Sequence, residues 1–145
     1  MFKYEPIVSS TEVRELAKNS TDPMELMEVW KYANAHNMYI YYAVPLAENK
    51  YTPISVLKEI AEQLYKIKEA KSPITEDELL IALANNTNSV EYVLNRVVKH
   101  CLNYNEFEHE KDYCFKIMKT VDHNPNATKK TKNLIDAFVL FSNIR

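Results

Sequence analysis

Apolar residues recur at intervals of three and four along most of the chain, which is the periodicity of a helix with one buried face. One such face carries Leu57, Ile60, Ala61 and Leu64. The breaks between periodic stretches are short, so we expect neighbouring helices to pack antiparallel. The pattern predicts eight helices, at residues 10–19, 22–34, 38–48, 52–70, 75–85, 89–103, 107–121 and 127–142.

The stretch at 38–48 is ambiguous, because MYIYYAV is dense in aromatic and β-branched residues that favour strands. No other segment of the chain offers a strand to pair with it, so a strand here would leave its backbone groups unsatisfied. We therefore expect a helix at 38–48.

Side chains that cap helix N-termini precede several of the predicted helices. TDPME places Asp22 as an N-cap with a proline at the first helical position, and YTPIS repeats this arrangement with Thr52. Ser9 and Thr75 each stand three residues before a glutamate, which is the spacing of a capping box. These residues predict where four of the helices begin.

Glycine is absent from all 145 residues, although average usage would give about ten. The glycine-dependent phosphate loops, dinucleotide fingerprints and nucleophile elbows are therefore excluded. Asparagine, the next residue most tolerant of left-handed backbone, occurs fourteen times. We expect it to replace glycine at helix C-termini, as suits an all-α protein.

Three stretches align without a gap when Asn19, Asn49 and Asn86 are superposed. They read ELAKNSTDPMELMEVW, PLAENKYTPISVLKEI and ALANNTNSVEYVLNRV. Each has Leu-Ala before the asparagine and a capping side chain three residues after it. A fourth copy, TVDHNPNATKKTKNLIDAF, is degraded, and the alignment leaves its register open by two residues. The pattern predicts a single domain over residues 1–145, in which a helix pair recurs about every 35 residues.

YYAVPLAENKYTPISVLKEIAE and LLIALANNTNSVEYVLNRVVKH resemble units of the HEAT-like and variant leucine-rich (LRV-type) α-helical repeats of bacteria. Those units read as an alanine-rich first helix, an Asn-x-x-Thr-Pro-like corner and a leucine-rich second helix. LRV units are shorter than the spacings here, so the HEAT-like helix pair is the better match. The resemblance implies a short right-handed solenoid of about four antiparallel helix pairs, an α-α superhelix, and usually partner binding without chemistry.

Net charge is −2, which argues against a general nucleic-acid binder, because such proteins normally carry a basic excess. No apolar run reaches the roughly 20 residues that cross a bilayer, and the N-terminus lacks the pattern of a secretory signal. Two cysteines are too few for a disulfide framework. We expect a cytoplasmic protein. Its Asn-, Lys- and Ile-rich composition suggests an AT-rich, bacterial or viral, genome.

Four soft metal ligands, His100, Cys101, Cys114 and His123, lie within 25 residues together with His109. No C-x2-C or H-x3-H pair occurs, so we expect no metal site, no cofactor and no catalytic residue, with both cysteines in the core. The alternative is a metal- or thiol-dependent enzyme around Cys101, Cys114 and His123. The acidic run at 76–78 lies in a first helical turn, where the helix dipole accounts for it.

Lys129, Lys130 and Lys132 form a short basic patch at the start of the last predicted helix. A solvated helix face explains the patch. The alternative is a nucleic-acid-facing protein that uses the patch to contact phosphate.

The second helices of a helix-pair solenoid line its concave face, and their polar positions form a ribbon across it. Tyr and Arg, which anchor protein interfaces, occur among these positions. The ribbon predicts a protein-recognition module, such as an adaptor, an inhibitor, or an immunity-type or regulatory protein; an ordinary solvated face is the alternative. Its positions include Glu25, Val29, Ser55, Lys58, Glu59 and Asn95, and the expected partner-binding residues are Glu28, Tyr32, Glu62, Tyr92, Arg96 and Lys99.

Overall fold

The computed structural model describes residues 10–69, 73–102 and 111–144, and in these ranges the chain is all-α, with nine helices and no strand. The helices are α1 (Ser10–Asn19), α2 (Pro23–Ala35), α3 (Tyr39–Glu48), α4 (Ile54–Glu62), α5 (Leu64–Glu69), α6 (Pro73–Asn85), α7 (Glu91–Leu102), α8 (Lys111–His123) and α9 (Lys129–Ile144).

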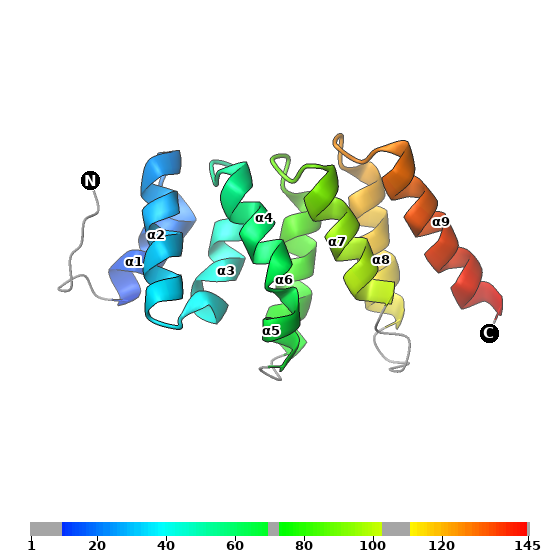
Figure 1. The fold of residues 1–145 in the computed structure, drawn as a ribbon, viewed down its shortest axis with the longest axis horizontal. Helices are drawn as coiled ribbons and strands as arrows, with labels where there is room; N and C mark the ends of the chain where they lie inside the picture. The colour runs from blue at the N-terminus through cyan, green and yellow to red at the C-terminus, as the bar shows by residue number, and fades with distance from the viewer. Residues whose placement is uncertain (1–9, 70–72, 103–110, 145) are drawn as a thin grey trace.

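The helices lie in two rows, with α2, α4, α7 and α9 in front and α1, α3, α6 and α8 behind them (Figure 1). In the back row α3 packs against α1 and α6, and α6 packs against α8. In the front row α4 packs against α7, and α7 against α9. The side chains of Trp30 and Glu59 join α2 to α4 through an Nε1–Oε1 hydrogen bond of 2.8 Å.

The core is one continuous apolar cluster to which both rows contribute. Leu26, Leu57 and Leu94 enter it from the front row, and Leu46 and Leu83 from the back row; all five are fully buried. Burial of each such side chain contributes about 1.5–3 kcal/mol relative to exposure. The apolar face seen in the sequence at Leu57, Ile60, Ala61 and Leu64 is therefore buried in this core.

The ambiguous stretch at 38–48 is a helix, as predicted, and it continues through Pro45. Proline has no backbone N–H, so the carbonyl of Tyr41 cannot accept the usual bond from four residues ahead. The Arg14 guanidinium of α1 donates to this carbonyl at 3.4 Å. This long, exposed hydrogen bond from α1 thus provides a donor for the Tyr41 carbonyl, which Pro45 leaves without its usual helical donor.

The prediction of one helix at 52–70 is wrong, because it is divided at Gln63 into α4 and α5. Gln63 has φ −101° and ψ 11°, and its N–H donates to the Ile60 carbonyl three residues back. The local sequence contains no proline or glycine that marks this break. Helix α6 also begins at Pro73, two residues before the predicted start.

Three buried asparagines, Asn49, Asn86 and Asn124, each lie just beyond a back-row helix, and their side chains link these corners in chain order. Asn86 Nδ2 donates to the carbonyls of Ala47 and Asn49 at 2.7 and 3.1 Å. Asn124 Nδ2 donates to those of Ala84 and Asn86, both at 2.9 Å. Each Oδ1 accepts the backbone N–H two residues further on. We call these three residues the asparagine ladder.

The first corner of the alignment departs from this pattern. Asn49 Nδ2 donates to the carbonyls of Ala17 and Ser20, at 3.0 and 2.9 Å. Asn19 itself is exposed, and its Nδ2 donates to Glu15 Oε1 within α1. Asn49 and Asn86, which the alignment superposes, both bind carbonyls of the preceding corner. Asn124 does the same in the fourth stretch.

A second row of bonds runs beside the ladder. Asn88 Nδ2 donates to the carbonyls of Lys50 and Thr52, at 2.7 and 3.1 Å. Asn126 Nδ2 makes the matching pair of bonds one corner later, at 2.7 and 3.0 Å. Each corner is therefore attached to the one before it by four side-chain hydrogen bonds from Asn86 onward.

The predicted capping roles are confirmed at Asp22 and wrong at Thr52 and Ser89. Asp22 Oδ1 accepts the N–H of Met24 at 3.0 Å. The Thr52 hydroxyl is buried and donates backward to the Leu46 carbonyl at 2.6 Å, and Ser89 makes the equivalent bond to α6. These hydroxyls close the preceding helix, and the next helix begins two residues later. Ser9 and the side chain of Thr75 lie outside the described residues.

The expected use of asparagine as a left-handed substitute for glycine holds at one position. Within the described ranges, Asn37 alone has a positive φ, at 55°. Asn49 has φ −84° and ψ 119°, which is extended backbone. Asparagine stands at that corner because its amide binds the neighbouring corner, and its tolerance of positive φ is not used.

Candidate functional site

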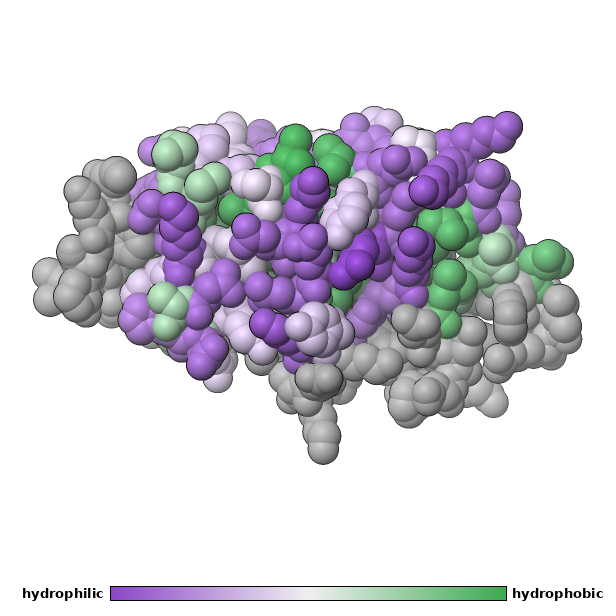
Figure 2. Space-filling model, viewed as in Figure 1, coloured by the Kyte–Doolittle hydropathy of each residue, from purple (hydrophilic) through white to green (hydrophobic). Residues whose placement is uncertain are grey.

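The predicted partner-binding residues lie on the front-row helices α2, α4 and α7, and we call their outer side the α2–α4–α7 face. Figure 2, which shows the front row, is mainly hydrophilic over these helices. Within the predicted ribbon, Val29 and Asn95 are buried and so do not belong to the face. Asn95 Oδ1 instead accepts the Thr131 hydroxyl of α9 at 2.7 Å.

Tyr92 lies among charged side chains from α4 and α7. Its hydroxyl donates to Glu62 Oε2 at 2.9 Å. The Lys58 ammonium and the Arg96 guanidinium lie 5.3 and 5.7 Å from its ring centroid, within the range of cation–π attraction. The hydrogen bond to Glu62 is the main reason that the pKa of Tyr92 is raised. The structure thus brings three predicted residues together, and we call this group the Tyr92 cluster.

A small hollow of about 210 Å³ adjoins the Tyr92 cluster. Buried Ala61 and Leu64 come from either side of the break at Gln63, while Tyr65 is 56% exposed. None of the residues that line the hollow is acidic. They are Ala61, Leu64, Tyr65, Arg96, Lys99 and His100.

His100, which lines this hollow, is held by a carboxylate from a different helix. Its Nε2 lies 2.6 Å from Glu76 Oε2, and the two side chains are only 11% and 7% exposed. Glu76 lies in the first turn of α6, where an interaction with the helix dipole was the only role predicted for it. The sequence carried no signal for this pair, because the residues lie 24 positions apart on separate helices.

Glu28 and Tyr32, the predicted residues on α2, have their own neighbours at one end of the face. Glu28 lies 3.8 Å from the Lys31 ammonium, one turn along the helix. The Tyr32 ring stacks on that of His36, with centroids 4.3 Å apart, and meets Tyr42 edge to face. The six predicted residues therefore divide into an α2 pair and a group on α4 and α7.

The cysteines occupy the core, as predicted, and both are free thiols. The pKa of Cys101 is raised well above the usual value, first by its hydrogen bond to Cys114, then by burial and by nearby acidic charge. A nucleophilic thiol needs the opposite shift. His109 lies outside the described residues. The Nδ1 atom of His123 makes a 2.7 Å bond with the Lys119 carbonyl of its own helix.

Within 10–69, 73–102 and 111–144, no three His, Cys, Asp or Glu side chains are grouped so that they could hold a metal ion. In the basic patch, Lys132 is engaged by Asp122, with Nζ and Oδ1 3.1 Å apart. Lys129 and Lys130 are exposed. Among the helices of the described part of the chain, none has the length and apolar character needed to span a membrane.

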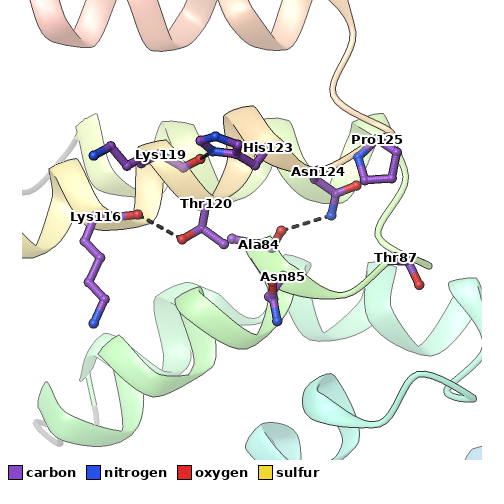
Figure 3. A pocket seen from close by; sticks show the side chains of 9 residues that line it. All are labelled: Ala84, Asn85, Thr87, Lys116, Lys119, Thr120, His123, Asn124 and Pro125. Atoms are coloured by element: carbon purple, nitrogen blue, oxygen red, sulfur yellow. Dashed lines mark hydrogen bonds between the residues drawn. The ribbon is translucent and has the colours of Figure 1, made fainter.

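A larger hollow of about 420 Å³ opens between α6 and α8, in the back row (Figure 3). Lys116 and Lys119 line it from α8, and their amines extend in different directions in Figure 3. No motif or spacing in the sequence marked these two lysines. Because the amines do not converge, the hollow presents no single anion site. The other lining residues are Ala84, Asn85, Thr87, Thr120, His123, Asn124 and Pro125.

The chain matches no protein-family model, and no curated protein or solved structure shows a significant similarity to it.

Proposed function

We propose that this protein is a recognition module that binds another protein through its α2–α4–α7 face, as an adaptor, an inhibitor or a regulatory protein would. The observation that carries the proposal is the Tyr92 cluster. Tyr92 is 39% exposed, and its side chain is held by Glu62 between two cations. Tyrosine and arginine are favoured interface anchors, and a side chain already held in place loses less conformational entropy on binding.

We infer that the architecture is a short right-handed solenoid of about four helix pairs, of the HEAT-like kind. The asparagine ladder supports this inference, because it joins successive corners with the same pair of bonds. The alternation of helices between two rows supports it too (Figure 1). In such a fold the second helices form a continuous binding face. The free cysteines agree with a cytoplasmic location, where thiols stay reduced.

The proposal is tested by capturing a partner from a lysate of the source organism, purifying it, and measuring its affinity for variants by calorimetry. The variant R96E/K99E reverses two charges one helical turn apart on α7. Loss of a charge-assisted contact and its replacement by repulsion should weaken binding at least about tenfold.

The matched control is K116E/K119E, which makes the same charge change with the same spacing on α8, in the other row. It should bind the partner as the wild type does, and both variants should keep the wild-type circular dichroism. Equal affinities for the wild type and R96E/K99E would show that this face does not bind the partner.

A further inference from the structure

We propose that the hollow between α4, α5 and α7 receives a carboxylate side chain from an acidic peptide segment of the partner. This inference rests on the proposed function and specifies the chemistry of the same face. It joins one feature of shape, the hollow of about 210 Å³, to one feature of charge, the Arg96 and Lys99 cations at its rim.

The size of the hollow matches a single side chain. Pockets that enclose drug-sized ligands or cofactors have volumes of about 300–1,000 Å³, so this one is too small for such molecules. Ala61 and Leu64 supply an apolar floor, and the half-exposed Tyr65 forms one wall. A short aliphatic stem with a charged end fits this combination of an apolar floor and a cationic rim.

The charges around the hollow favour an anion. Two acids bonded to residues beside the hollow already have partners, because Glu62 accepts from the Tyr92 hydroxyl and Glu76 is bonded to His100. Within the described ranges, Arg96 and Lys99 form no ion pair. Two fixed positive charges therefore face the hollow without a carboxylate among the residues that line it.

Arg96 is also oriented before any ligand arrives. Its guanidinium carbon lies 5.7 Å from the Tyr92 ring centroid, and the Tyr92 hydroxyl is anchored on Glu62. A planar guanidinium matches a carboxylate through two parallel hydrogen bonds. This cation–π contact with a ring that Glu62 anchors restricts the Arg96 side chain in advance, so binding costs less conformational entropy.

The rest of the face favours a peptide over a nucleic acid. Glu25 and Glu28 on α2 and Glu59 and Glu62 on α4 would repel a phosphate backbone that extended along the face. An acidic peptide needs only one short contact with the α7 end. Apolar residues beside its carboxylate would contact Tyr65 and Tyr92, which are 56% and 39% exposed.

The test is a selection of random twelve-residue peptides displayed on phage against the immobilised wild-type protein. We expect the enriched peptides to share Asp or Glu next to an apolar residue. A synthetic, fluorescently labelled peptide should then bind in a polarisation assay, and changing its Asp to Asn or its Glu to Gln should weaken binding at least about tenfold. This last change leaves the protein untouched, so a folding defect cannot cause it.

The protein variant R96Q/K99Q should bind the acidic peptide at least about tenfold more weakly than the wild type does. The control variant K116Q/K119Q should bind the peptide as the wild type does. The inference is overturned if no peptide is enriched, if the enriched peptides carry no acidic excess, or if the neutral peptide binds equally well. Tighter binding of a labelled oligonucleotide than of the peptide also overturns it. The proposed function is decided by a different measurement, the affinity of the captured partner for R96E/K99E and for the wild type. A negative peptide result therefore overturns this inference without deciding the proposed function.

Discussion

Replacing Asn86 with Asp tests whether the asparagine ladder holds the molecule together. Asn86 is 6% exposed, and its Nδ2 donates to the carbonyls of Ala47 and Asn49 at 2.7 and 3.1 Å. Asp keeps the size of the side chain and the oxygen that accepts the Asn88 N–H. It replaces the donating amide with an oxygen that faces two carbonyl oxygens. The change therefore removes two of the four side-chain bonds to the preceding corner and places a carboxylate beside two carbonyl oxygens.

The magnitude follows from the bonds that are lost. Two net hydrogen bonds contribute about 1 kcal/mol each, and the buried Ala47 carbonyl left without this donor costs about 1–3 kcal/mol more. The Asn49 carbonyl still accepts the Thr52 N–H. We expect Asn86→Asp to lower the free energy of unfolding by about 3–5 kcal/mol. Because a domain of this size has a total stability of only about 5–15 kcal/mol, this loss is large.

The assay is urea unfolding, followed by circular dichroism at 222 nm and by the fluorescence of Trp30, the single tryptophan. Asn85→Asp is the matched control, because it makes the same change one residue earlier, at an exposed side chain. It should alter stability by no more than about 0.5 kcal/mol. If the two variants agree within 1 kcal/mol, about the value of a single bond, the ladder does not stabilise the fold as argued.

Two further predictions concern buried groups. Thr52→Val removes the hydroxyl that closes α3 and keeps the shape of the side chain, and the Leu46 carbonyl still accepts the Asn49 N–H. It should lower the free energy of unfolding in urea by about 0.5–1.5 kcal/mol, the value of one hydrogen bond. Thr87→Val, at an exposed threonine, should change it by almost nothing. The hydrogen bond to the second cysteine, together with burial, raises the pKa of Cys101 in the folded protein, so thiolate formation favours the unfolded chain. This contribution to stability is fully present below the ordinary thiol pKa of about 8.5 and is lost as the pH rises above it. Melting temperatures between pH 7 and 10 should fall less steeply for Cys101→Ala than for the wild type; equal slopes would contradict this reasoning.

The helices were largely predictable because apolar residues recur at helical spacing along most of the chain and because few residues connect the helices. The position of α3 followed from the lack of any strand that could pair with MYIYYAV. The break at Gln63 was not predictable, because glutamine is a good helix former and nothing beside it interrupts a helix. Propensity describes a local preference, and the packing of distant helices determines where a long apolar stretch divides.

The alignment of Asn49 with Asn86 located the corners correctly, but the reason assigned to the asparagines was incomplete. A left-handed turn is a local property that a sequence can suggest. The bond from Asn86 to Ala47 joins residues 39 positions apart, and only a three-dimensional arrangement reveals it. The same holds for Thr52 and Ser89, whose hydroxyls turn back toward the helix already completed.

The candidate surface was predictable as a set of helix faces and unpredictable as a set of contacts. Spacing placed Tyr92, Arg96 and Lys99 on the helix predicted at 89–103 and Glu62 within the helix predicted at 52–70, whereas the structure has Glu62 as the last residue of α4. Spacing gave no indication that the Tyr92 hydroxyl meets Glu62 or that His100 is paired with Glu76. It also admitted Val29 and Asn95, because a helical face defined by spacing alone is wider than the part that neighbouring helices leave uncovered.

The asparagine ladder fixes distances along one edge of the molecule and leaves the opposite edge free of that constraint. The ladder residues are separated by 37 and then 38 positions, so the number of residues between two corners already varies. Natural variants should accept inserted or deleted residues where front-row and back-row helices meet away from these corners. One extra residue between Asn86 and Asn88 would displace both amides from their carbonyls, so sequence length should be strictly kept there.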